Sequence, residues 1–162
     1  MVSFLLIFYL AVVRLSGFVY PIETSVATQG VAAEWVYGWL GVQGFWADLT
    51  AALLLLAQAV AINLMTIDHR LGEEVNLFPG LFYVLVASAL PEFQYLSPLH
   101  LANTFLIIAL WQLLQTYRRS DCAKQIFNIG FWVAVASLFY PAYLIFLLLG
   151  FIGLNLLRAV RF

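Results

Sequence analysis

The chain has 162 residues, of which 65% are hydrophobic and only 9% are charged, and its mean hydropathy is +1.00. Soluble domains are about half apolar and a quarter charged, so this composition excludes an ordinary soluble globular fold. The net charge of −1 and the lack of a basic stripe exclude nucleic acid as a partner, and the single cysteine, Cys122, excludes an intrachain disulfide.

Apolar segments recur along the chain and predict membrane-spanning helices, each needing about 20 residues to cross a hydrocarbon core roughly 30 Å thick. The last apolar run, 126–157, is too long for one helix, and Pro141 divides it because the residue before a proline is disfavoured in a helix. We therefore expect one all-α domain over residues 1–162, a polytopic transmembrane bundle of about six spans. The expected spans are 2–20, 49–67, 77–90, 99–117, 126–139 and 142–157.

The segment 31–46 is rich in aromatic residues and glycine but contains no basic residue. Its aromatic residues are Trp35, Tyr37, Trp39, Phe45 and Trp46. Trp and Tyr collect at membrane–water boundaries, so we expect an interfacial helix on the outer face rather than a further crossing.

The basic residues outside the spans occupy alternate intervals between them, which is an independent test of the number of spans. They are Arg70, Arg118, Arg119, Lys124, Arg158 and Arg161. The intervals 21–48 and 91–98 and the Tyr140-Pro141 turn contain no basic residue. The positive-inside rule then places both termini in the cytoplasm.

Arg14 and Glu23 are the first candidates for a functional site. Arg14 lies within the first expected span, where charges are rare, and its guanidinium suits an anion such as a lipid-linked phosphate. The structural alternative is that Arg14 extends its charge to the interface or pairs with an outer carboxylate such as Glu23. Glu23 follows the first span directly and is the candidate catalytic residue.

Three further carboxylates, Glu34, Asp48 and Glu92, form an expected acidic cluster on the outer face. Carboxylates at the mouth of a bundle can act as a general base or bind a divalent cation, although simple solvation explains any one of them. His69 and His100 lie on opposite sides of the membrane in this topology, so they cannot share a metal ion. We predict no metal site.

Amide side chains within the expected spans are predicted to hydrogen-bond between helices, each bond contributing about 0.6–2 kcal/mol. They are Gln58, Asn63, Asn103, Gln112, Asn128 and Asn155. They do not form a relay of ionisable groups, which argues against a proton-driven pump.

Three stretches carry a resemblance to a known family: 53–63 (LLLLAQAVAIN), 78–110 and 130–151 (GFWVAVASLFYPAYLIFLLLGF). Together they resemble an uncharacterised family of multi-pass inner-membrane proteins of Bacteroidota, a domain of unknown function. The members of that family are longer, and this chain resembles their N-terminal half. The resemblance implies a location in the bacterial inner membrane.

The layout is also distantly similar to the first half of GT-C membrane glycosyltransferases, which take sugars from polyprenyl-phosphate donors. That likeness implies a catalytic role for Glu23, an interfacial position for 35–46 and binding of a polyprenyl phosphate. GT-C loops usually carry a pair of acidic residues, whereas here Ile22 precedes Glu23.

Two functions follow as hypotheses. The leading one is a non-catalytic scaffold or subunit of a membrane complex, whose partners are the lipid bilayer and other membrane chains, with no cofactor. The alternative is a GT-C-like glycosyltransferase, or half of one, which works at the outer face with Glu23 as base or ligand of a divalent cation. A transporter is a weaker third reading, since the spans lack buried acids and paired unwound helices.

Overall fold

The computed structural model describes residues 30–41, 44–69, 78–116 and 123–158. These residues form helices and turns, and no strand occurs among them, so this part of the chain is all-α as the composition predicts. In chain order the elements are α2 (Val31–Leu40), α3 (Phe45–Asp68), α4 (Phe78–Ser88), the 3₁₀ helix η1 (Pro91–Phe93), α5 (Pro98–Gln115), α6 (Ala123–Phe139), the 3₁₀ helix η2 (Pro141–Ile145) and α7 (Phe146–Arg158).

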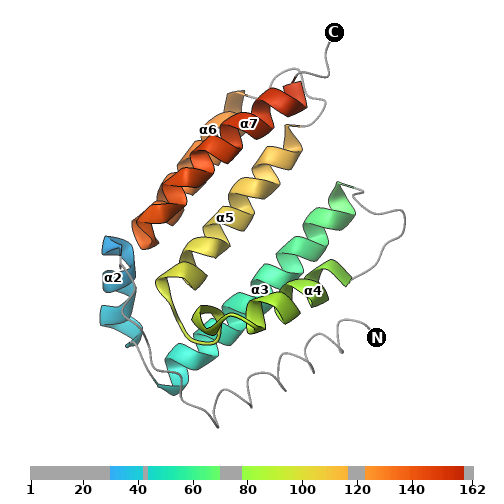
Figure 1. The fold of residues 1–162 in the computed structure, drawn as a ribbon. Coiled ribbons are helices and arrows are strands. Elements are labelled where there is room, and N and C mark those ends of the chain that lie inside the picture. Colours follow the sequence, from blue (N-terminus) through green and yellow to red (C-terminus); the bar gives the residue numbers. More distant parts are fainter. Residues whose placement is uncertain (1–29, 42–43, 70–77, 117–122, 159–162) are drawn as a thin grey trace.

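The long helices α3, α5, α6 and α7 run along the body of the molecule, with α4 beside α3 (Figure 1). Successive helices reverse direction from α3 to α7 (Figure 1). One end of the body therefore holds α2, η1, η2 and the first turns of α3 and α5. We call this the aromatic end, after Trp35, Trp39, Phe45 and Trp46. The opposite end holds the last turn of α3 and the first turn of α6.

Local sequence explains where several helices begin and end. Ser97 is extended and its hydroxyl accepts a hydrogen bond from the backbone N–H of His100, while Pro98 occupies the first helical position of α5. Tyr140, the residue before Pro141, is extended (φ −141°, ψ 104°), so α6 ends at Phe139 and a new helix begins at the proline. The break therefore lies where the sequence places it.

The aromatic segment differs from the expected single helix over 31–46. It is divided between α2, which ends at Leu40, and the first turn of α3, which contains Phe45 and Trp46. Two glycines cause the division: Gly41 has φ 76° and Gly44 has φ 132°, a region that L side chains rarely adopt. As a result α3 begins four residues before the expected span at 49.

Within the described residues, α3 is the one helix that is long and apolar enough to cross a membrane by length and composition. Its 24 residues correspond to about 36 Å at 1.5 Å per residue. Only 33% of its most apolar stretch is buried, whereas the core helix of a soluble protein is mostly buried. Phe78–Ser88, Ala123–Phe139 and Pro141–Gly153 are shorter apolar helices.

The interior contains small and polar residues, and large apolar side chains cover much of the surface. Ala51, Ala59, Ala102 and Ala136 are fully buried, as are the side chains of Gln58 and His100. Exposed apolar residues on α3, α4, α6 and α7 include Leu53, Val60, Leu64, Phe82, Val86, Phe127, Phe131, Leu138, Leu148, Phe151 and Ile152. We call this exposed set the apolar belt. The core also contains large apolar residues, among them Leu55, Val84, Leu96 and Val133. The feature that departs from a water-soluble domain is therefore the extent of the exposed apolar surface.

Candidate functional site

The structure describes three of the five expected site residues. Arg14 and Glu23, the candidate anion-binding and catalytic residues, lie outside the described residues. Glu34 is exposed on α2, Asp48 is half-buried in the first turn of α3, and Glu92 is half-buried in η1. All three belong to elements at the aromatic end (Figure 1). Among the described residues, no group of three or more His, Cys, Asp or Glu side chains could hold a metal ion.

Two contacts hold α2 against the aromatic end of the bundle. The backbone N–H of Gly30 donates to the carbonyl of Phe139, at the last residue of α6, with an N···O distance of 3.0 Å. A Cβ atom at Gly30 would lie only 1.9 Å from the carbonyl oxygen of Leu138, so only glycine permits this approach. At the other end of α2 the hydroxyl of Tyr37 donates to the carbonyl of Leu96 at 3.0 Å. The helix therefore connects the end of α6 with the start of α5.

Burial raises the pKa of the Tyr37 phenol well above its ordinary value, and the nearby Tyr95 raises it further. The phenol therefore stays protonated at every physiological pH, and its hydrogen bond to Leu96 persists. The face of α2 that does not contact the bundle presents Trp35 and Trp39, whose ring centroids lie 5.6 Å apart. Both side chains are exposed, as are those of Phe45 and Trp46 at the start of α3.

A hydrogen-bond network joins α3, α4 and α5 in the interior, and Gln58 is its centre. The amide nitrogen of Gln58 donates to the carbonyl of His100 at 3.0 Å and to the hydroxyl oxygen of Thr104 at 2.7 Å. Its amide oxygen accepts from the Tyr83 hydroxyl at 2.5 Å. The Tyr83 oxygen in turn accepts from the amide of Asn103 at 2.6 Å. The four side chains thus form one continuous chain of donors and acceptors through three helices.

A second polar contact joins α3 to α4 nearer the opposite end. The amide oxygen of Asn63 accepts from the backbone N–H of Gly80 at 2.7 Å. That N–H belongs to the first turn of α4, where it has no partner within the helix, so Asn63 satisfies it. A Cβ atom at Gly80 would lie 2.4 Å from the Asn63 amide nitrogen and 2.7 Å from the Ala59 carbonyl oxygen. Glycine is therefore required for α3 and α4 to approach this closely.

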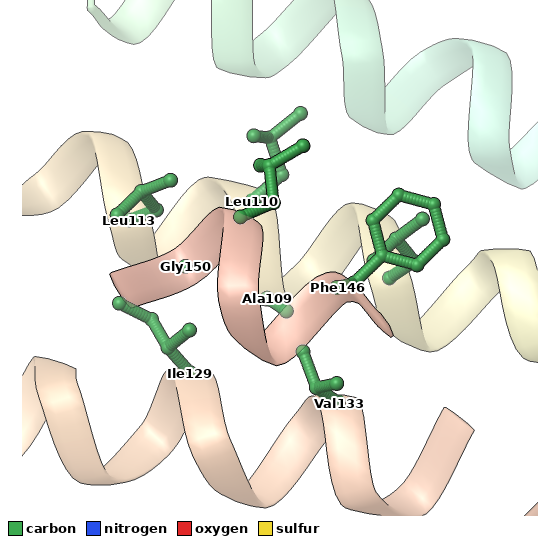
Figure 2. A pocket seen from close by; sticks show the side chains of 9 residues that line it. Ala109, Leu110, Leu113, Ile129, Val133, Phe146 and Gly150 are labelled. Carbon is green, nitrogen blue, oxygen red and sulfur yellow. The ribbon is translucent and has the colours of Figure 1, made fainter. Parts of the chain in front are cut away.

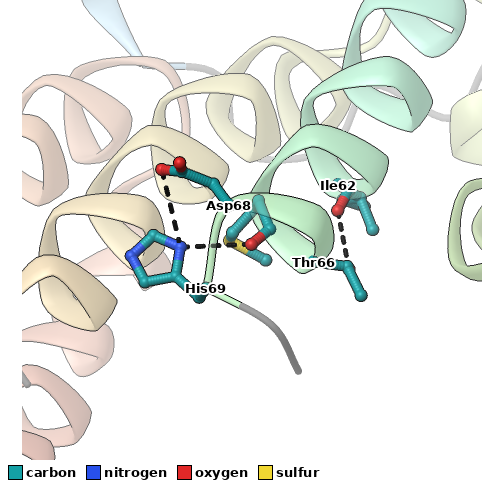
Figure 3. A network of polar contacts seen from close by, with 5 residues as sticks. Ile62, Thr66, Asp68 and His69 are labelled. Carbon is teal, nitrogen blue, oxygen red and sulfur yellow. Dashed lines mark hydrogen bonds and ion pairs between the residues drawn. The ribbon is translucent and has the colours of Figure 1, made fainter. Parts of the chain in front are cut away.

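The two histidines lie at opposite ends of the bundle. His100 is fully buried in the first turn of α5, and its ring packs on Phe93 with centroids 5.1 Å apart. His69 follows the last turn of α3, where its Nδ1 lies 3.1 Å from the Met65 carbonyl oxygen and 4.0 Å from the Asp68 carboxylate (Figure 3). Because Asp68 is largely exposed, the contact between His69 and Asp68 contributes little to stability.

The prediction that amide residues would hydrogen-bond between helices is confirmed for Gln58, Asn63 and Asn103, and for the longer Asn128–Gln112 contact of 3.4 Å. Sequence reasoning missed Tyr83 and Thr104, which complete the network. The position of Tyr83 inside an apolar segment could have revealed its role, because a buried phenol requires a hydrogen-bond partner. The network links neutral donors and acceptors, so it can fix helix positions but offers no charged group for catalysis.

Comparisons of the chain with protein-family models, with curated proteins and with solved structures find no match.

Proposed function

We propose that the chain is a multi-pass bundle of the bacterial inner membrane, with about six spans, which serves as a non-catalytic scaffold or subunit of a membrane complex. The observation that carries this proposal is the large exposed apolar surface, which surrounds a core that also contains polar side chains. Gln58, Asn63 and His100 are buried, while the large side chains of the apolar belt are exposed. In lipid this arrangement costs nothing at the surface, whereas in water it would expose far more apolar area than soluble monomers do.

The lengths of the helices support several crossings. At 1.5 Å per residue, the 18 residues of α5 and the 17 of α6 correspond to about 27 Å and 25 Å, close to the hydrocarbon thickness of roughly 30 Å. The 3₁₀ helix η2 with α7 gives about 30 Å, since a 3₁₀ helix rises about 2.0 Å per residue.

Helix α4 is shorter, at about 16 Å for 11 residues. The turns between α4 and α5 carry the chain onward to the aromatic end (Figure 1). There the Gln94 side chain donates to the Ser88 carbonyl and the Ser97 hydroxyl donates to the Glu92 carbonyl. Phe93, Leu96 and Ser97 are buried in this segment. Non-helical backbone is tolerated at membrane depth when protein surrounds it and its polar groups are satisfied.

The two ends of the bundle support an orientation. Elements at the aromatic end carry Glu34, Asp48 and Glu92, while Lys124 is exposed in the first turn of α6 at the opposite end. The sequence intervals 70–77 and 117–122, which join helices at that opposite end, contain Arg70, Arg118 and Arg119. The positive-inside rule favours the opposite end on the cytoplasmic side, with both termini there and α2 at the outer interface.

Cysteine labelling of spheroplasts tests this topology. In a Cys122→Ser background, Val31→Cys places the single thiol at an exposed position of α2, and Lys124→Cys places it at an exposed position of α6. We expect a membrane-impermeant maleimide to modify the cysteine at 31 before lysis and the cysteine at 124 only after lysis. Labelling of both positions only after lysis would contradict the outer location of α2, and recovery of the protein in the soluble fraction would contradict the membrane proposal itself.

The scaffold role rests on the use of the interior polar groups for packing. Both N–H bonds of the Gln58 amide, and its oxygen, are engaged by neighbouring helices. The GT-C-like alternative rests on Glu23 and Arg14, and binding of a polyprenyl phosphate separates the two functions. We expect no saturable binding by the wild type and a lower melting temperature for Arg14→Ala. Saturable binding that Arg14→Ala abolishes without a change in melting would favour the enzyme, as would a transferase activity lost in Glu23→Gln.

A further inference from the structure

An apolar pocket of about 240 Å³ lies between α5, α6 and α7 (Figure 2). Ala109 of α5 and Gly150 of α7 line it, and Ile129 and Val133 approach from α6. Phe146 forms part of the wall near the start of α7. Every side chain around the pocket is apolar, so nothing in it can hydrogen-bond to a headgroup, a peptide or water.

Two glycines of α7 determine how closely this helix packs beside the pocket. Gly150 contributes no side chain, and a Cβ atom there would lie 3.2 Å from Ile129 Cγ2. One turn further along α7, a Cβ at Gly153 would lie 3.0 Å from Leu113 Cδ2. Helix α7 therefore approaches α5 and α6 closely at these two glycines. The pocket lies beside the contact at Gly150, which lines it.

The pocket opens onto the apolar belt. Leu110 and Leu149 both line it, and both are partly exposed at the surface, at 39% and 52%. Leu148, Phe151 and Ile152 of the belt continue the apolar surface from its edge. If the bundle lies in a membrane as proposed above, the medium at this opening is the hydrocarbon of the bilayer.

We propose that this pocket holds one acyl chain of a membrane phospholipid. This inference rests on the proposed membrane location. An apolar cavity of about 150 Å³ stays dry and takes up benzene, so by the same ratio a pocket of 240 Å³ accommodates about ten chain carbons. A helix of a second copy is too wide for this volume, since it measures about 10 Å across. The wholly apolar wall selects the chain and leaves the headgroup outside.

Photocrosslinking in vesicles of phosphatidylethanolamine and phosphatidylglycerol tests the proposal. The probe is phosphatidylethanolamine with a diazirine in the middle of one acyl chain. We expect peptides containing Leu110 and Leu149 to be labelled in excess over peptides containing Leu53 and Val60, which are exposed on α3 and lie outside the pocket. An equal yield at all four positions would contradict a bound chain while leaving the membrane location intact. Absence of labelling throughout would contradict the membrane location.

Two variants of adjacent residues provide the matched control. Leu149→Trp places a large side chain at the mouth of the pocket, whereas Leu148→Trp makes the same change at an exposed neighbour that does not line it. We expect labelling at Leu110 to fall about tenfold in the first variant, which corresponds to about 1.4 kcal/mol of binding free energy, and to stay unchanged in the second. An equal fall in both, or displacement of the probe by polyprenyl phosphate but not by unlabelled phosphatidylethanolamine, would overturn the proposal.

Discussion

The two sides of the bundle are held together by different interactions. On the polar side, where α3, α4 and α5 meet, Gln58 and its partners and the Asn63–Gly80 contact supply hydrogen bonds of 2.5–3.0 Å between helices. On the apolar side, where α5, α6, η2 and α7 meet, Phe105 stacks on Trp132 and on Phe139. The side-chain hydrogen bond there, between Asn128 and Gln112, is 3.4 Å long.

If the bundle lies in a membrane as proposed, this difference indicates which interactions fix the positions of the helices. Burial of apolar surface supplies little net drive between helices in lipid, because the tails outside are as apolar as the side chains inside. Directional hydrogen bonds therefore fix the relative positions of the helices on the polar side. On the apolar side, ring stacking and the longer Asn128–Gln112 bond hold the helices together, and the pocket lies on this side. Matched changes on the two sides are therefore expected to differ in their effect on stability.

The largest effect is expected for Gly80→Ala on the polar side. The new Cβ would lie 2.7 Å from the Ala59 carbonyl oxygen, a backbone atom that cannot move alone, and it would disturb the bond to Asn63. We expect a loss of about 3 kcal/mol in the free energy of unfolding, in the range for an overpacked core. Thermal unfolding in detergent measures it.

Gly150→Ala is the counterpart of that change on the apolar side. The nearest atom there is Ile129 Cγ2 at 3.2 Å, part of a side chain that can shift by a few tenths of an ångström. We expect a change within about 1 kcal/mol, because the helix propensity gained offsets the strain. Equal losses from Gly80→Ala and Gly150→Ala would show that both sides are packed with the same tolerance.

An intermediate effect is expected for Gln58→Met, which keeps the size of the side chain and removes three hydrogen bonds. Interhelical bonds in membrane proteins average about 0.6 kcal/mol, so a loss of about 2 kcal/mol is expected. Gln112→Met removes only the 3.4 Å bond from Asn128 and should cost less than about 0.5 kcal/mol. Unfolding curves of the two variants in the same detergent give the comparison, and similar losses would refute the central role of Gln58.

The smallest effect is expected for Gly130→Ala in the middle of α6. Among the described residues, no atom outside the local backbone of α6 lies within 4 Å of the Cβ that this change would add. Alanine has the higher helix propensity, so the variant should be more stable by up to about 1 kcal/mol. A measurable loss of stability would mean that another chain or another segment of this one packs against Gly130.

Particular residues show how far the sequence alone could lead. The Tyr140-Pro141 break and the start of α5 at Ser97-Pro98 were predictable, because proline and a capping serine act on their immediate neighbours. The division of the aromatic segment was not, since a run of glycines permits a positive φ without requiring one. The Gln58–Tyr83 pair joins residues of separate helices, and their register depends on packing. For Arg14 and Glu23 the predictions still await a test.

The attachment of α2 has a consequence for the order of events during synthesis. Gly30 bonds to Phe139, a residue made roughly 110 positions later, which at 5–20 residues per second means a delay of about 5–20 s. Tyr37 reaches its partner Leu96 earlier, 59 positions along the chain. Tyr37 can therefore contact its partner before Gly30 can, and α2 is held at both of its ends only after α6 has been made. If the bundle lies in a membrane as proposed, the indoles of Trp35 and Trp39 hold α2 at the lipid surface during that interval.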